Sequence, residues 1–256
     1  MRMRGGIAAV LGVAMALLAV EAGPARGGEP ATPEDLAWGK TVYVRACANC
    51  HGTQGKGDGM AAEFLDPRPR DFTKGRYKFR TTPSGAVPTL EDLGRTVSHG
   101  LAGTAMGPWR ELSSKDLRAV LLYVQSFSER FQAKAPQPIT VPPETPFSLE
   151  AVKRGAKLYT AIECHKCHGS EGRGDGPSAG QLKDDWEKRP IRPPDLTQGG
   201  RFKRGATPRD IYLTVFTGLT GTPMPSAAEQ LENAEQEWDL VHYVYWLSQG
   251  KRPPAP

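Results

Sequence analysis

Apolar residues recur along much of the chain at the three- and four-residue spacing of a single helix face. The clearest such stripe consists of Leu117, Val120, Leu121, Val124 and Phe127. A matching stripe near the C-terminus consists of Leu240, Tyr243, Val244 and Leu247. No competing run alternates between apolar and polar residues, as a half-buried strand would. The pattern therefore predicts an all-α fold.

Each predicted helix begins at a residue type that favours the N-cap position, where a side-chain oxygen can accept a free backbone N–H. The expected N-caps are Thr32, Thr89, Ser113, Ser148, Thr207 and Asn233. They divide into three helices in the first half of the chain and three in the second. Glycine and proline make up about a fifth of the residues, with 29 and 23 copies, so long loops should join these helices.

The chain contains one unit twice. A Cys-x-x-Cys-His segment at residues 47–51 returns 117 residues later at residues 164–168. A Gly-Thr-x-Met segment that ends at Met106 returns 118 residues later and ends at Met224. The second copy has a longer loop around residues 183–194. This self-similarity predicts two tandem domains of the same architecture.

The N-terminus has the pattern of an export signal. Arg2 and Arg4 precede 14 apolar residues from Ile7 to Val20, and small residues follow. A membrane span needs about 20 apolar residues, whereas this length is typical of a signal peptide. We therefore expect a periplasmic protein, either soluble or peripherally associated with the membrane.

Four segments follow from the repeat and the signal. The expected boundaries are a signal peptide at 1–25, a first domain at 26–132, a linker at 133–147 and a second domain at 148–256. The linker contains five prolines, so we expect it to be extended and semi-rigid.

The net charge of +5 lies mostly in the first domain. Residues 26–134 carry 16 basic against 12 acidic side chains, while residues 135–256 carry 15 of each. A charge this small and this local does not indicate a nucleic-acid-binding protein.

The four cysteines allow several chemistries. An even number in an exported protein first suggests disulfides, and four thiols could hold zinc. A redox Cys-x-x-Cys would follow a strand, which is absent here, and a shared zinc site would not need a separate set of helices for each pair. Cys-x-x-Cys-His is the attachment signature of c-type haem. We therefore expect two haem c groups, bound through Cys47, Cys50, Cys164 and Cys167, with His51 and His168 as iron ligands.

The second iron ligand should be a methionine in each half. Met106 follows His51 by 55 residues, and Met224 follows His168 by 56. The alternative, that both are core filler, is weaker because no other methionine pair is superimposed by the repeat. His99 and His242 are poorer candidates for this ligand. His99 matches Thr217 in the second copy, and His242 matches Ala119 and lies on the last helix, which we expect to be buried.

Two filled axial positions leave no place for a small-molecule substrate at the iron, and methionine raises the reduction potential relative to a second histidine. The residues therefore predict an electron carrier rather than an enzyme. The alternative is a dihaem enzyme, either peroxidase-like or acting on a small sulfur or nitrogen compound, in which one iron loses its methionine.

These motifs resemble class I cytochrome c, twice over, at roughly residues 33–130 and 148–250. The resemblance implies that the first and last helices of each domain cross, with Gly39 against Tyr123 and Gly155 against Trp246. It also implies redox proteins as partners, with a membrane respiratory complex as one candidate, while donor and acceptor stay open.

A basic run in the first half has an echo in the second. Arg76 and Lys78 correspond to Arg201 and Lys203. We interpret these four residues as partners of the haem propionates. Two alternatives are a docking surface for an acidic protein, where charge speeds encounter, and a solvated basic loop.

Overall fold

Helices dominate the residues that the computed structural model describes, which are 31–133, 137–185 and 188–254. Within those ranges strand pairing is limited to one isolated bridge between Lys183 and Pro190. The α-helices are α1 (Pro33–Ala46), α2 (Ala48–His51), α3 (Leu90–His99), α4 (Ser114–Ser126), α5 (Leu149–Ala161), α6 (His165–His168), α7 (Pro208–Thr217) and α8 (Ala234–Ser248). The loops contain the 3-10 turns η1 (Ala62–Phe64), η2 (Phe72–Lys74), η3 (Glu129–Phe131), η4 (Ala179–Gln181) and η5 (Gly199–Arg201). The all-α prediction is confirmed; the expected signal peptide lies outside the described residues.

All six predicted N-caps are confirmed. In each case the side-chain oxygen of the cap accepts the backbone N–H three residues later, as Thr32 does from Asp35 at 3.0 Å. The caps of the other long helices are Thr89, Ser113, Ser148, Thr207 and Asn233. Local capping chemistry therefore fixes where the long helices start.

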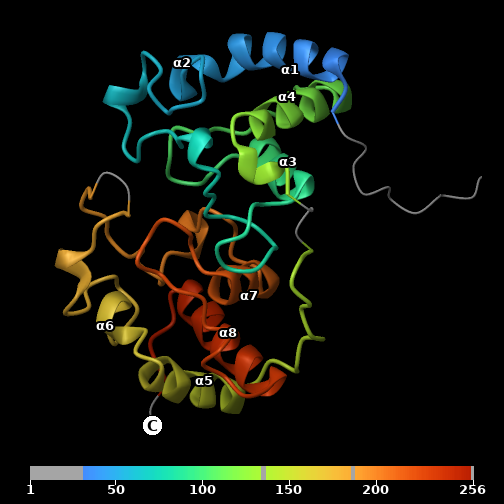
Figure 1. Ribbon diagram of the computed structural model, residues 1–256. Helices are drawn as coiled ribbons and strands as arrows, with labels where there is room; N and C mark the ends of the chain where they lie inside the picture. The colour runs from blue at the N-terminus through green and yellow to red at the C-terminus, as the bar shows by residue number, and fades with distance from the viewer. Residues whose placement is uncertain (1–30, 134–136, 186–187, 255–256) are drawn as a thin grey trace, which may run out of the picture. The chain divides into compact units, whose positions relative to one another are not determined.

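The first and last helices of each half pack against each other, α1 with α4 and α5 with α8 (Figure 1). Glycine permits the close approach. A Cβ on Gly39 would lie 2.2 Å from the carbonyl oxygen of Ala119 and 2.8 Å from the Cβ of Tyr123. A Cβ on Gly155 would lie 1.9 Å from the carbonyl oxygen of Asp239.

The expected contact between Gly155 and Trp246 is wrong. The aromatic residue at this crossing is Tyr243, whose Cβ would lie 2.8 Å from a Cβ on Gly155. Trp246 lies three residues further along α8, where its indole Nε1 donates to the carbonyl oxygen of Arg252 at 2.7 Å. Both aromatic residues sit on α8, and only the helix packing decides which one faces α5.

The middle helices complete each half, α3 against α4 and α7 against α8. The second half has one continuous buried cluster, which includes Val152, Trp238 and Leu247. In the first half the buried apolar residues form two clusters, one around Tyr43 and another around Tyr77. The two halves thus share their helices but not the organisation of their cores.

The described part of the proline-rich segment between the halves, residues 137–147, makes contacts at several points. Ile139 and Val141 contact the core of the second half. The Ile139 backbone N–H donates to the carbonyl oxygen of Thr81 at 2.7 Å, and the Trp238 indole donates to that of Pro142 at 3.2 Å. The segment therefore contacts both halves; from Ala31 onward the chain forms one compact unit.

None of the helices in the described ranges has the length and apolar character that crossing a membrane requires.

Candidate functional site

One helical turn brings the two thiols and the histidine of each motif together. In the first half, α1 ends at Ala46, and the Cys47 N–H still bonds to the carbonyl oxygen of Tyr43 at 2.8 Å. The His51 N–H then bonds back to the carbonyl oxygen of Cys47 at 2.9 Å. The second motif repeats this turn, with the His168 N–H bonded to the carbonyl oxygen of Cys164 at 2.9 Å. Because of this turn, the two cysteines and the histidine of each motif lie close together.

Each motif histidine is held through one ring nitrogen. His51 Nδ1 lies 3.1 Å from the carbonyl oxygen of Arg70, and His168 Nδ1 lies 3.4 Å from that of Pro194. Burial lowers the pKa of both imidazoles, which favours the neutral ring. A neutral ring that donates from Nδ1 presents the lone pair of Nε2, which is the form in which histidine binds iron.

A buried tyrosine anchors the loop that follows each motif. The Tyr43 hydroxyl donates to the carbonyl oxygen of Gly52, and the Tyr159 hydroxyl donates to that of Gly169, both at 2.8 Å. Burial raises the pKa of both phenols, so they remain protonated donors. The same bond in both halves shows that this anchor belongs to the repeated unit.

Glycine is required where this loop turns back under the histidine. Gly57 and Gly174 both have φ near 74°, in the left-handed region. A Cβ on either would lie 2.6 Å from a backbone carbonyl oxygen, that of Pro69 or Pro193. The N–H groups of these glycines bond to the carbonyl oxygens of the motif histidines at 2.9 and 2.8 Å. This explains why glycine occupies positions 57 and 174, six residues after each motif histidine.

All four thiols are free and partly buried. Burial raises the pKa of Cys47 and of Cys164 to about 11. Free thiols exclude the disulfide alternative in this structure. Across the ranges described, no three His, Cys, Asp or Glu side chains gather as a metal-binding group, so the zinc alternative gains no support.

The two Gly-Thr-x-Met loops have the same hydrogen bonds. The Leu101 N–H bonds to the carbonyl oxygen of Met106 at 2.8 Å, and the Leu219 N–H bonds to that of Met224 at 3.1 Å. The N–H of each methionine bonds to the hydroxyl oxygen of the threonine two residues earlier, at 3.1 and 3.2 Å. Both methionines are half-buried. Their backbones are therefore fixed in the same conformation in both halves.

The two competing histidines have other surroundings. His99 is exposed at the end of α3, with Nδ1 3.0 Å from the carbonyl oxygen of Arg95. His242 is fully buried in the core of the second half, with Nε2 3.3 Å from a carboxylate oxygen of Glu144. Neither residue belongs to the repeated loops.

The four basic residues expected near the propionates separate into two kinds. Arg76 and Arg201 are exposed. Lys78 and Lys203 are half-buried and within electrostatic range of each other. The pKa of Lys78 is lowered to about 8, first by burial and then by the neighbouring charges of Arg70 and Lys203. The structure thus brings one lysine from each half together and leaves the two arginines in solvent.

Arg70 lies in the basic run of the first half but is not among the four residues expected at the propionates. It belongs to the same positive group as Lys78 and Lys203, and its carbonyl oxygen also faces His51. Its place in the basic run directly before Asp71 was the available signal. Asp184 lies within electrostatic range of Arg70 and of Lys78, and Asp66 within range of Lys203, so the group also has acidic neighbours.

These donor sets fit one c-type haem in each half. Two free thiols can form thioethers, an imidazole is held with Nε2 available, and a methionine lies in a hydrogen-bonded loop. The same set is complete in both halves.

Comparison with protein families gives a match in each half. A family described as cytochrome c matches residues 36–128, and one described as cytochrome c oxidase, cbb3-type, subunit III matches residues 150–244. Cytochrome c-554(547) of Halothiobacillus neapolitanus is 36% identical over 94 residues, which is 35% of this chain and 93% of that protein.

A second relative is the cbb3-type cytochrome c oxidase subunit FixP of Azorhizobium caulinodans, 29% identical over 147 residues. That match covers 54% of this chain but only 40% of the relative. Among solved structures, the chain is similar to one from the Kuenenia stuttgartiensis reducing HAO-like protein complex. The TM-score is 0.79 and the identity 46%, over 83% of this chain and 96% of that one.

Proposed function

Because the chain belongs to the cytochrome c family, as two tandem domains with one covalently bound c-type haem each, we propose that it is a periplasmic electron-transfer protein. It takes one electron from a reduced protein donor and passes it to an oxidised protein acceptor, and no atom is transferred. The observation that carries this proposal is the duplicated set of histidine and methionine loops, which have matching hydrogen bonds in both halves.

In this proposal the residues of each half have separate tasks. Cys47 and Cys50 attach one haem, with His51 and Met106 as the iron ligands. The second site consists of Cys164, Cys167, His168 and Met224. The protein contributes fixed ligands that need no rearrangement between redox states, and a methionine that favours the reduced iron.

We assign the propionate contacts to Lys78 and Lys203, with Arg70 beside them. All three are partly buried, and a haem carboxylate there would add to the negative charge that Asp184 and Asp66 already supply. Arg76 and Arg201 are exposed and suit contacts with solvent or a protein partner better. Replacing Lys78 by Gln should therefore shift a haem reduction potential more than replacing Arg76 by Gln.

The partners are redox proteins. One relative is named as an oxidase subunit, and the similar structure comes from a named complex. Both names favour a carrier that works with, or within, a larger respiratory assembly. The excess of positive charge in residues 26–134 favours an acidic partner at the first domain.

A second candidate function is that of an enzyme. The observation that favours it is the 46% identity to a chain of the reducing HAO-like complex. In this case one iron would lose its methionine and bind a small molecule. The intact methionine loop in each half favours the carrier.

A reductive titration separates the two functions. The carrier should accept two electrons per chain, and the reduced protein should bind no carbon monoxide at neutral pH. Binding of one carbon monoxide per chain to the reduced protein would favour the enzyme. The charge of the first domain is tested by the rate of electron transfer with an acidic redox protein at low and at high salt. Salt screens the attraction between the two proteins, so the rate should fall as salt is added.

A further inference from the structure

Arg80 belongs to the first half, and its buried side chain contacts the second half. Its side chain is fully buried, and its Nη2 donates to the carbonyl oxygen of Thr217 at 2.6 Å. The rest of the guanidinium is held by its own half, at the carbonyl oxygens of Tyr77 (2.9 Å) and Pro83 (3.1 Å). Its pKa is lowered to about 10, chiefly by burial, and the charge is kept at neutral pH.

The acceptor in the second half is the start of the Met224 loop. Thr217 is the last residue of α7, and Gly218, with φ 65°, turns the chain into that loop. The Leu219 N–H then closes the loop on the carbonyl oxygen of Met224. A carbonyl at a helix C-terminus lacks a helical partner and carries the negative end of the helix dipole, so a buried guanidinium is a strong partner for it.

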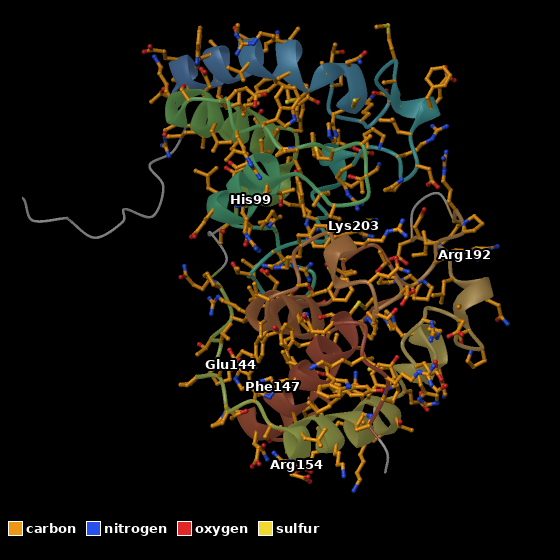
Figure 2. All side chains as sticks on the ribbon, turned by 180° about the vertical axis from the view of Figure 1, so that it is seen from behind. His99, Glu144, Phe147, Arg154, Arg192 and Lys203 are labelled. Carbon is orange, nitrogen blue, oxygen red and sulfur yellow. The ribbon has the colours of Figure 1, made fainter. Side chains whose placement is uncertain are left out.

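A second arginine at this contact is less well bonded. Arg204 directly follows Lys203, and its Nη1 donates back to the carbonyl oxygen of Arg80 at 2.9 Å. Its side chain lines a small cavity at the end of α3, together with His99 and Gly100. The Nε of Arg204 is buried there without a hydrogen-bond partner. Figure 2 labels Lys203 and His99, which line this cavity.

We propose that Arg80 is a positioning residue for Met224, through which the first domain holds the second domain's methionine loop in place. The inference rests on the proposed ligand role of Met224. In this proposal the contact between the halves makes Met224 harder to displace from the second iron. Beside the Met106 loop, Arg204 donates to the carbonyl oxygen of Arg80 rather than to that of His99.

Competition with imidazole tests this proposal in the intact ferric dihaem protein. Imidazole replaces a methionine ligand more readily when the loop is loose. Spectra of Met106→Ala and Met224→Ala assign the signals of the two irons. Arg80→Met keeps the volume of the side chain but removes every donor, and Arg80→Lys keeps the charge and one donor.

The matched control is Arg130→Met. Arg130 also donates to two backbone carbonyls, those of Gly75 (2.9 Å) and Gly85 (2.6 Å), but both lie in its own half. Full haem content and unchanged helicity are required of each variant before titration. Arg80→Lys provides the test if Arg80→Met does not fold.

We expect Arg80→Met to raise the imidazole affinity of the second iron about tenfold, as loss of a charge-assisted hydrogen bond implies. Arg80→Lys should give a smaller rise, and Arg130→Met none. Unchanged affinity at the second iron, or an equal rise at both irons, overturns the proposal. If Met224→Ala leaves the wild-type spectrum unaltered, the assignment of Met224 as a ligand fails instead.

Discussion

The two halves keep the same loops around different cores. The turn of each motif, the tyrosine anchor and the methionine loop match bond for bond. In contrast, the second half has one continuous apolar cluster that extends to the linker, whereas the first half has two clusters that share Phe72 as a partly buried contact. The hydrogen bonds around the motif histidines and in the methionine loops are thus shared by the two halves, and the first half has less core of its own.

The largest expected effect comes from removing one haem at a time. Cys47→Ser/Cys50→Ser and Cys164→Ser/Cys167→Ser should each halve the haem content. Because the first half has the divided core, its apo form should lose helical structure, while the apo second half should keep most of it. Limited proteolysis of the two purified variants measures this. Equal protease resistance of the two apo halves would contradict the comparison of the cores.

A smaller but still severe effect is expected at the helix crossings. Gly155→Ala and Gly39→Ala both force a methyl group against backbone, at 1.9 and 2.2 Å. Each should lower the free energy of unfolding by about 3 kcal/mol. Urea denaturation followed by haem absorbance gives both values. Gly94→Ala is the control, since a Cβ there would meet only Leu121, at 3.5 Å; a loss as large as at the crossings would refute the close-approach argument.

Among the described residues, an ion pair joins the first and last helices only in the second half. Arg154 donates from Nε and Nη2 to the carboxylate of Asp239 at 2.6 and 2.8 Å, and that carboxylate is nearly fully buried. Arg154→Gln should cost about 2 kcal/mol because it weakens the pairing of a buried charge. At the matching position Trp38 donates to Asp116 in an exposed bond of 2.7 Å, so Trp38→Phe should cost well under about 1 kcal/mol. Thermal unfolding of both variants compares them, and equal losses would show that burial does not set the difference.

The smallest effect should be the same in both halves. Tyr43→Phe and Tyr159→Phe each remove one buried hydrogen bond to a glycine carbonyl, at 2.8 Å in both cases. Each should cost about 1 kcal/mol. The two losses, measured by urea denaturation, should agree within about 0.5 kcal/mol. A clear difference would mean that the anchor has diverged along with the core.

Local chemistry made much of the fold predictable from the sequence. An N-cap acts within three residues, so the helix starts at Thr32 and Ser148 could be predicted from the sequence. The attachment motif lies within one helical turn, so the role of the two cysteine pairs could be predicted in the same way. The repeat then extended each interpretation to the other half.

Contacts between distant segments could not be predicted in this way. The position of Tyr243 rather than Trp246 opposite Gly155 depends on the rotation of α8. The burial of Arg80 depends on how the second half meets the first, and no local pattern distinguishes it from Arg76, which is exposed. The roles of Lys78, Lys203 and Arg70 were open in the sequence for the same reason.

Electron paramagnetic resonance of the ferric protein as purified, together with a count of covalently bound haem, tests the central claim most directly. The account predicts two haems per chain and only low-spin signals, because histidine and methionine fill both axial positions of each iron. Fewer than two haems, or a high-spin signal from either iron at rest, would contradict it.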